Sequence, residues 1–282
     1  MMAVLVSVFS LIEIFSPAWT NGLLPIVALA VFLSLIGFLD DRYGLSISLR
    51  FGAQALAVGG FLACYPEWRL LPILPLEIER FLELIAGVGW INIVNFMDGI
   101  DLISAAQAVP TTLVIFIASF MDIIPPALGL LAAMLLGVLL GFVPFNIPPA
   151  RIFLGDSGSL PLGFFLGVML YALAVSITFS GALLLALYYL TDSITTLVKR
   201  FRRGEKIWQA HREHGYQRAV HLHGWPVGRV SGAIFALNFL FSAVALYIGF
   251  FSTPFQAGIS LLLGTFCVFI LLRCFGQPAH RA

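Results

Sequence analysis

Four polar side chains recur at intervals of three in the stretch NIVNFMDGID: Asn92, Asn95, Asp98 and Asp101. At the end of a helix, this spacing places them at neighbouring positions on one face. The stretch lies between two long apolar runs, and ionisable groups at the mouth of a membrane segment are costly unless they have partners. These amides and carboxylates are therefore candidates for binding or catalysis. A polar loop in which Asp serves as a helix cap explains them equally well.

The composition indicates a membrane protein. Of the 282 residues, 60% are hydrophobic and 10% are charged, whereas a soluble domain carries roughly 25% charged residues. A membrane-spanning helix needs roughly 20 apolar residues. The apolar runs predict an all-α, polytopic bundle of about ten spans that forms a single membrane domain. The expected spans are 1–15, 23–39, 48–64, 81–97, 104–121, 127–145, 160–179, 182–198, 230–251 and 255–272.

The distribution of basic residues predicts the orientation of these spans. Of the 15 Lys and Arg residues, all but Arg69 and Arg80 fall in one of the two alternating sets of loops. Cytoplasmic loops carry the excess of Lys and Arg. We therefore expect both termini to be cytoplasmic, together with four loops that carry polar residues. These loops are 40–50, 92–103, 146–158 and 199–229.

This topology brings acidic residues from several spans to the cytoplasmic face. They are Asp40, Asp41, Asp98, Asp101, Asp156 and Asp192. On that face they lie beside the basic stretch 199–218, KRFRRGEKIWQAHREHGYQR. Mg²⁺ is usually bound by one or two carboxylates together with substrate phosphates. Clustered carboxylates that face a basic loop therefore fit a magnesium-assisted site for a phosphorylated substrate.

Two further segments could contact such a substrate. Asp156 stands among small residues in GDSGS, at the start of the seventh span, and a helix N-terminus suits an anion. An ordinary helix start with an Asp or Ser cap is the alternative. In the basic stretch, His211, Arg212 and His214 could clamp a diphosphate, although such a stretch can also bind anionic lipids. The net charge of +1 gives no indication of a nucleic acid partner.

Four motifs in sequence order resemble those of a known membrane family. They are GFLDDRYGLS, NIVNFMDGID, FLGDSGSLPLG and HREHGYQR. Together they look like the polyprenyl-phosphate N-acetylhexosamine-1-phosphate transferases, the family that contains MraY and WecA. The stretch RRGEKIWQAHREHGYQR is most similar to the WbpL-like branch.

The resemblance implies an activity and a set of partners. HexNAc-1-phosphate would pass from UDP-HexNAc to undecaprenyl phosphate with release of UMP, and this would start an O-antigen-like polysaccharide chain. The implied cofactor is Mg²⁺, with Mn²⁺ as the alternative. The implied location is the bacterial inner membrane, among membrane lipids, with the site facing the cytoplasm. A homodimer is compatible with the resemblance.

The resemblance also implies roles for individual residues. Asp156 would hold the metal, with Asp98 as a second ligand. Asp40 and Asp41 would lie near the lipid phosphate, one of them as a candidate base. The other implied catalytic residues are Asp101, His211 and His214, and the implied substrate-binding residues are Asn92, Asn95, Phe153, Gly155, Arg50 and Arg212.

Two departures from the family pattern affect these expectations. Leu102 follows Asp101 where the family has Gly, which predicts an altered turn. Family members also have a further span and a basic cytoplasmic loop before the part that matches. We therefore expect a shortened chain that inserts into the membrane but transfers poorly. A transporter of an anionic or lipid-linked solute, or an inactive family member, is the alternative function.

Overall fold

The computed structural model describes residues 22–206, 211–251 and 253–279, together with Met2, Val6, Ser7, Phe9 and Ser10. Apart from those five residues, the expected first span at 1–15 lies outside the described residues, as does the segment 207–210 of the basic loop. Within the described ranges all regular secondary structure is helical, which confirms the all-α prediction.

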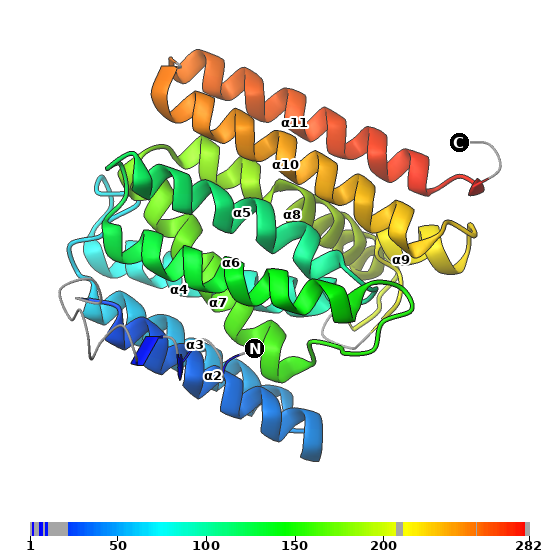
Figure 1. Cartoon of the computed structure of the whole chain (residues 1–282), viewed down its shortest axis with the longest axis horizontal. Helices are drawn as coiled ribbons and strands as arrows, with labels where there is room; N and C mark the ends of the chain where they lie inside the picture. The colour runs from blue at the N-terminus through cyan, green and yellow to red at the C-terminus, as the bar shows by residue number, and fades with distance from the viewer. Residues whose placement is uncertain are drawn as a thin grey trace.

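Nine of the described helices are long and apolar enough to cross a membrane, and α9 is a short helix at one end of the bundle (Figure 1). The helices are α2 (Leu24–Tyr43), α3 (Ile47–Cys64), α4 (Leu76–Met97), α5 (Ile103–Phe120), α6 (Pro126–Asn146), α7 (Asp156–Ser176), α8 (Phe179–Arg202), α9 (Gly215–His221), α10 (Val227–Phe251) and α11 (Pro254–Phe275). They confirm the second to tenth expected spans.

The expected boundaries need correction in several places. The break between the seventh and eighth spans lies at Ile177 and Thr178, and Ser180 and Gly181 belong to the first turn of α8. The expected loop 40–50 is reduced to residues 44–46, because α2 continues to Tyr43 and α3 starts at Ile47. Gly44 ends α2 in the left-handed conformation that glycine adopts readily.

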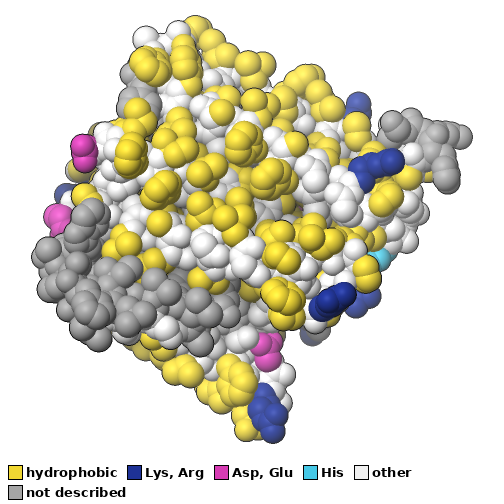
Figure 2. Space-filling view, viewed as in Figure 1, with side chains coloured by type: hydrophobic (Ala, Val, Ile, Leu, Met, Phe, Trp, Pro, Cys, Tyr) yellow, Lys and Arg dark blue, Asp and Glu magenta, His cyan; other side chains and the backbone are white. Residues whose placement is uncertain are grey.

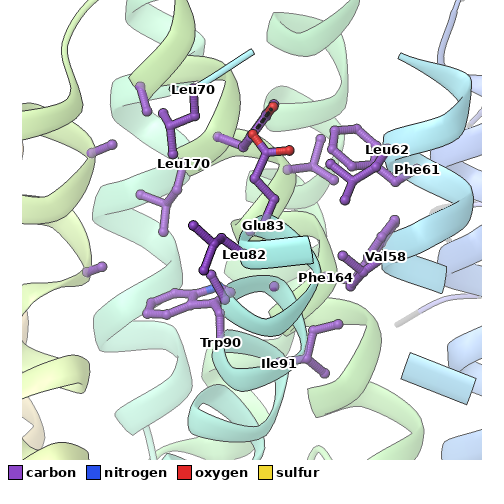
Figure 3. Close-up of a pocket in the computed structure, with 18 of the residues that line it drawn as sticks. Val58, Phe61, Leu62, Leu70, Leu82, Glu83, Trp90, Ile91, Phe164 and Leu170 are labelled. Carbon is purple, nitrogen blue, oxygen red and sulfur yellow. Dashed lines mark hydrogen bonds between the residues drawn. The ribbon is translucent and has the colours of Figure 1, made fainter. Parts of the chain in front are cut away.

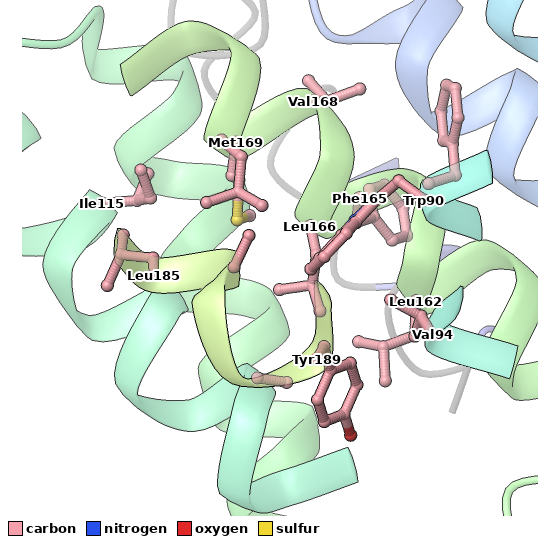
Figure 4. Close-up of a cluster of buried hydrophobic side chains, with 14 of the residues drawn as sticks. Trp90, Val94, Ile115, Leu162, Phe165, Leu166, Val168, Met169, Leu185 and Tyr189 are labelled. Carbon is pink, nitrogen blue, oxygen red and sulfur yellow. The ribbon is translucent and has the colours of Figure 1, made fainter. Parts of the chain in front are cut away.

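The helix α7 forms the centre of the bundle. Of its most apolar 18-residue stretch, 78% is buried, compared with 17% for α11 at the periphery. It packs against α2, α4, α5 and α8. Figure 4 shows Phe165, Leu166 and Met169 of α7 among side chains such as Ile115 of α5 and Leu185 of α8. Side chains that must reach the start of α7 therefore come from helices already in contact with it.

Small residues bring α7 close to its neighbours. Association between helices in lipid depends on close packing, because the lipid tails are as apolar as the side chains. A Cβ at Gly163 of α7 would lie 3.1 Å from the Cα of Ile91 in α4. A Cβ at Gly37 of α2 would lie only 2.2 Å from the carbonyl oxygen of Asp156. The backbone of α2 is thus in direct contact with the start of α7.

The surface agrees with a membrane location. In the face shown in Figure 2, hydrophobic side chains cover the middle, and most of the Lys and Arg groups gather toward the end that carries α9. The exposed apolar residues on the flanking helices include Leu262, Leu263 and Phe266 of α11. A polytopic membrane bundle accounts for this arrangement, since lipid can cover such a surface.

We predict that Gly37→Ala destabilises the protein by about 1–3 kcal/mol, the usual range for overpacking, because the new methyl group separates α2 from α7. Thermal unfolding of the detergent-purified protein, followed by tryptophan fluorescence, measures this loss. Gly52→Ala is the matched control, since a Cβ at Gly52 of α3 meets nothing within 4 Å. Equal melting temperatures for the two variants would contradict the prediction.

Candidate active site

Five polar residues from four helices meet at the start of α7, and we call them the acidic cluster: Asp40, Asp41, Arg50, Asn95 and Asp156. The first N–H groups of a helix have no partner within the helix. Here Asp41 accepts the backbone N–H of Asp156 at 3.0 Å and that of Ser157 at 3.1 Å. Asp41 therefore caps α7 from the last turn of α2.

Asp40 and Arg50 form the side of the cluster next to Asp156. Arg50 Nη1 lies 2.8 Å from Asp40 Oδ2 and 3.7 Å from Asp156 Oδ2. The other oxygen of Asp40 accepts the backbone N–H of Leu45 at 2.7 Å. Asp40 is therefore paired on both oxygens, and Arg50 lies between two carboxylates whose charges it offsets.

The two asparagines of α4 have different surroundings. Asn95 donates to Asp156 Oδ1 and to Ser159 Oγ, both at 2.8 Å, so it joins α4 to the first turn of α7. Asn92 lies one helical turn deeper and is buried, where it exchanges hydrogen bonds with Gln54 of α3. The structure thus places Asn95 in the cluster and Asn92 at a helix–helix contact.

Asp98 and Asp101 separate because the chain leaves the helix at Met97. Asp98 accepts the hydroxyl of Ser104 at 2.5 Å, and Asp101 accepts the backbone N–H of Ala150 at 3.1 Å. Burial raises the pKa of Asp98 to about 6; the hydrogen bond from Ser104 opposes this and the nearby charge of Asp156 adds to it. Asp98 is therefore close to the acidic cluster, whereas Asp101 holds the loop that follows α6.

A cavity of about 370 Å³ lies beside Asp98, and we call it the polar cavity. Three of its walls are the end of α4, the start of α9 and the described part of the basic loop. Its lining residues are Phe96, Asp98, Gly99, His211, Arg212, His214, Gln217 and His221. The end of α4 and the described part of the basic loop, which are far apart in the sequence, thus meet at one end of the bundle (Figure 1).

The two histidines of the loop differ in environment. His214 is buried, its ring stacks on that of Tyr216 at a centroid distance of 5.8 Å, and neither ring nitrogen has a hydrogen-bond partner. His211 is half-buried, and its ring centroid lies 4.7 Å from that of His214. Burial, with the neighbouring His214 and Arg200, lowers the pKa of His211 to about 4, so it is neutral at neutral pH. Arg212 is the exposed cation of the polar cavity.

The other described basic residues of the loop include several that are held in ion pairs. Arg200 is buried and lies 2.8 Å from Glu205, and Arg203 pairs with both Glu205 and Glu213. Of the two implied substrate-binding residues next to Asp156, Phe153 is 71% exposed in the loop before α7. Gly155 has a φ of +61°, and a Cβ there would lie 2.8 Å from Asp41 Oδ2.

Comparison with known proteins gives the family. Residues 23–174, over half of the chain, match glycosyl transferase family 4. The chain belongs to this family. It is 32% identical over 167 residues to a decaprenyl-phosphate N-acetylglucosaminephosphotransferase of Mycolicibacterium smegmatis, which is 53% of this chain and 41% of that protein.

Other relatives in glycosyl transferase family 4 match more of the chain. The Mycobacterium leprae protein of the same name is 27% identical over 72% of this chain and 59% of its own length. A phospho-N-acetylmuramoyl-pentapeptide-transferase of Staphylococcus aureus is 26% identical over 85% of this chain and 80% of its own length. The chain thus spans about half the length of the mycobacterial relatives.

Asp156 of the acidic cluster and the nearby Asp98 suit a magnesium ion, the cofactor that the family resemblance implies. Among the described residues, no three His, Cys, Asp or Glu side chains form a complete metal site by themselves. Mg²⁺ usually takes only one or two protein carboxylates and fills its shell with waters and substrate phosphates. Asp156 and Asp98 supply oxygen donors of that type, so the donor set fits.

Several residues of the site lack a strong sequence signal. Ser159 and Gln217 lie inside the quoted motifs FLGDSGSLPLG and HREHGYQR, and Ser104 lies three residues after Asp101, so helical spacing from the motif residues could have found all three. Asp192 and Asn146 act across long sequence separations, on α9 and on Leu102 respectively. The only sequence signal for Asp192 is that it is an isolated acidic residue within an apolar span.

The departure at Leu102 has a structural counterpart. Leu102 has a φ of +66°, in the left-handed region that favours glycine. Its backbone N–H donates to Asn146 Oδ1 at 2.7 Å, and Asn146 also donates to the carbonyl of Ile152. The turn therefore keeps a conformation that suits the family's glycine, and Asn146 helps to hold it.

We predict that Leu102→Gly raises the free energy of unfolding by up to about 1 kcal/mol. The left-handed conformation costs a residue with a Cβ about 1–2 kcal/mol, and part of this gain is lost to the greater freedom of glycine when unfolded. Leu102→Ala is the control, because it removes the same side chain but keeps the Cβ. Thermal unfolding that ranks alanine above glycine would contradict the prediction.

Proposed function

We propose that this chain transfers a sugar 1-phosphate from a nucleotide diphosphate sugar to a polyprenyl phosphate in the membrane. The family and the activities for which its relatives are named support this class of reaction. We propose UDP-HexNAc as the donor, undecaprenyl phosphate as the acceptor and UMP as the second product. The product would start a cell-surface polysaccharide chain.

One observation carries the proposal: α4 brings the acidic cluster and the polar cavity together. Asn95 bonds to Asp156 in the cluster, and Asp98, three residues later, lines the cavity. A phosphate held at Asp156 and a nucleotide held in the polar cavity would therefore lie on adjacent surfaces. The arrangement suits a donor whose diphosphate joins a nucleotide to the reacting sugar phosphate.

A second cavity suits the apolar chain of the acceptor. It measures about 390 Å³, within the ~300–1,000 Å³ that ligand cavities occupy. Figure 3 shows Glu83 near one end and Trp90 and Ile91 of α4 near the other. Ile91 and Gly163 lie about one turn below Asn95 and Ser159, so the cavity begins directly beneath the acidic cluster. An isoprenoid chain in this cavity would leave its phosphate near Asp156.

The proposed reaction is a displacement at the sugar-linked phosphorus of the donor. An oxygen of the polyprenyl phosphate forms the new bond to that phosphorus. The bond from the phosphorus to the bridging oxygen of the diphosphate breaks, and UMP leaves with that oxygen. A phosphate nucleophile is already ionised at neutral pH, so positioning and charge neutralisation supply most of the catalysis.

We propose a separate role for each residue of the site in binding the metal, binding the phosphates or positioning other groups. Asp156 and Asp98 would hold Mg²⁺, which neutralises diphosphate charge when bound. Arg50 would face the acceptor phosphate from between Asp40 and Asp156. Arg212 and His214 would contact donor phosphates from the polar cavity. Asp41 would position the first turn of α7, because its two oxygens already accept the backbone N–H groups of Asp156 and Ser157.

We place the site on the cytoplasmic face of the bacterial inner membrane. The Lys and Arg bias toward this end of the bundle supports that orientation. UDP-sugars are made in the cytoplasm, so the orientation also gives the site access to its donor.

We predict that Asp156→Asn lowers UMP release to a few per cent of the parent rate, because an amide keeps the shape but loses the charge that holds the metal. The assay uses purified protein, UDP-GlcNAc, undecaprenyl phosphate and MgCl₂. Asp122→Asn is the matched control: Asp122 is exposed in the turn between α5 and α6, at a φ of 58° that asparagine tolerates.

Equal activity of these two variants would contradict the assignment of Asp156 as a ligand of the metal. Parallel assays with other UDP-HexNAc donors identify the sugar. No UMP release from the parent with any donor would contradict the proposed function.

We predict that Arg212→Ala reduces transfer at least about tenfold, the loss expected when a charge-assisted bond to phosphate is removed. Arg202→Ala is the control, since Arg202 is exposed at the end of α8, where lipid headgroups can satisfy its charge. The measurement is the initial rate of UMP release at fixed donor concentration. Equal losses in both variants would instead indicate a basic collar that binds lipid.

A further inference from the structure

Asp192 is a buried carboxylate within α8, and it is outside the acidic cluster and the polar cavity. Only 1% of its surface is exposed. A buried charge is costly unless hydrogen bonds satisfy it, and four donors surround this one. Two are hydroxyl groups of α8 itself: Tyr188 donates at 3.2 Å and Thr196 at 3.4 Å.

The other two donors belong to the start of α9. The backbone N–H of Gly215 donates to Asp192 Oδ1 at 2.7 Å, and that of Tyr216 donates to Oδ2 at 3.3 Å. Each carboxylate oxygen thus takes one N–H from the first turn of α9. The two bonds fix both the position and the direction of that turn relative to α8.

A short helix of this kind needs external support. The seven residues of α9 are too few to form a stable helix alone, because isolated helices shorter than about 12 residues are marginal in water. The opposite side of α9 is held by Tyr216, whose hydroxyl donates to the carbonyl of Phe96 at 3.3 Å. Asp192 and Phe96 therefore hold α9 between α8 and the end of α4.

The start of α9 carries side chains that line the polar cavity. His214 precedes Gly215 directly, its Nδ1 lies 3.8 Å from Asp192 Oδ1, and its two buried ring nitrogens have no hydrogen-bond partner. Gln217 lines the cavity and accepts the backbone N–H of His214 at 3.4 Å. If the first turn of α9 shifts, His214 and Gln217 shift with it.

We propose that Asp192 is a positioning residue for the nucleotide-sugar donor, which acts by holding the start of α9 against α8. This inference deepens the proposed function and rests on it. Asp192 does not contact the donor; it sets where His214 and Gln217 meet the donor's phosphates. Its loss should weaken donor binding and leave binding of the acceptor phosphate, which we place at the acidic cluster, unaffected.

Asp192→Asn is the main test, because an asparagine has the same shape but only one oxygen for the two N–H groups of α9. We expect the KM for UDP-HexNAc to rise about tenfold or more, since small displacements of binding groups have effects of this size. The KM for polyprenyl phosphate should stay unchanged. Thr196→Val is the matched control: it removes one hydroxyl bond to the same carboxylate but keeps both bonds to α9.

Hydrogen exchange of the backbone amides in the detergent-purified protein tests the same proposal and does not require an activity assay. Peptides that cover 211–221 should exchange faster in Asp192→Asn than in the parent or in Thr196→Val, with the helices α4 and α7 unchanged. Unchanged exchange at 211–221, a rise spread over the whole bundle, or equal increases in both KM values would overturn the proposal. If the parent shows no transfer, the proposed function fails, and the exchange pattern still decides whether Asp192 holds α9.

Discussion

The position of the site depends on the contact between the last turn of α2 and the first turn of α7. Asp41 accepts two backbone N–H groups of α7, and Ser34 donates to the carbonyl of Ser157 at 2.8 Å. Gly37 lies between these two residues on α2 and lets the backbones touch. Because the contact fixes Asp156 at the start of α7, Arg50 and Asn95 can reach it from α3 and α4.

The carboxylates near the site fall into two groups by their partners. Asp41 and Asp192 each use both oxygens to accept backbone N–H groups at a helix start, on α7 and on α9. Both oxygens of each residue are therefore occupied by backbone N–H groups of the helix that it holds. Asp98 and Asp156 are bonded mainly through one oxygen each, to Ser104 and Asn95. Each therefore keeps one oxygen that can coordinate a metal or contact a substrate. Sequence spacing shows where the carboxylates stand but not which of them accept backbone N–H groups, so it cannot separate the two groups.

The sequence was sufficient to predict the nine described membrane-spanning helices and the end of the bundle where polar residues gather, but not the short helix α9 within the predicted loop 199–229. Apolar run length and the Lys and Arg bias carry that information, since lipid imposes both. The sequence was not sufficient to predict which contacts the individual polar residues make. The spacing of Asp98 and Asp101 predicts one helix face, but the helix ends at Met97 and the two side chains diverge. The partner of Asn92 is Gln54, 38 residues away, and no local pattern indicates such a pair.

The helix α4 shows how a precise site is possible in a bundle with weak lateral forces. Hydrogen bonds between membrane helices contribute only about 0.6 kcal/mol each on average, so a single pair such as Asn92 and Gln54 cannot fix a helix. At its far end, however, Glu83 of α4 pairs with Arg80 and accepts the hydroxyl of Tyr171 from α7 at 2.8 Å.

Asn95 bonds to α7 again about 18 Å away, the rise of twelve helical residues. Two polar contacts on the same pair of helices resist both sliding and rotation, whereas one contact resists neither fully. The hydrogen bond between Tyr171 and Glu83 at the far end of the bundle therefore contributes to the placement of Asn95, and through it to the alignment of Asp98 with the polar cavity.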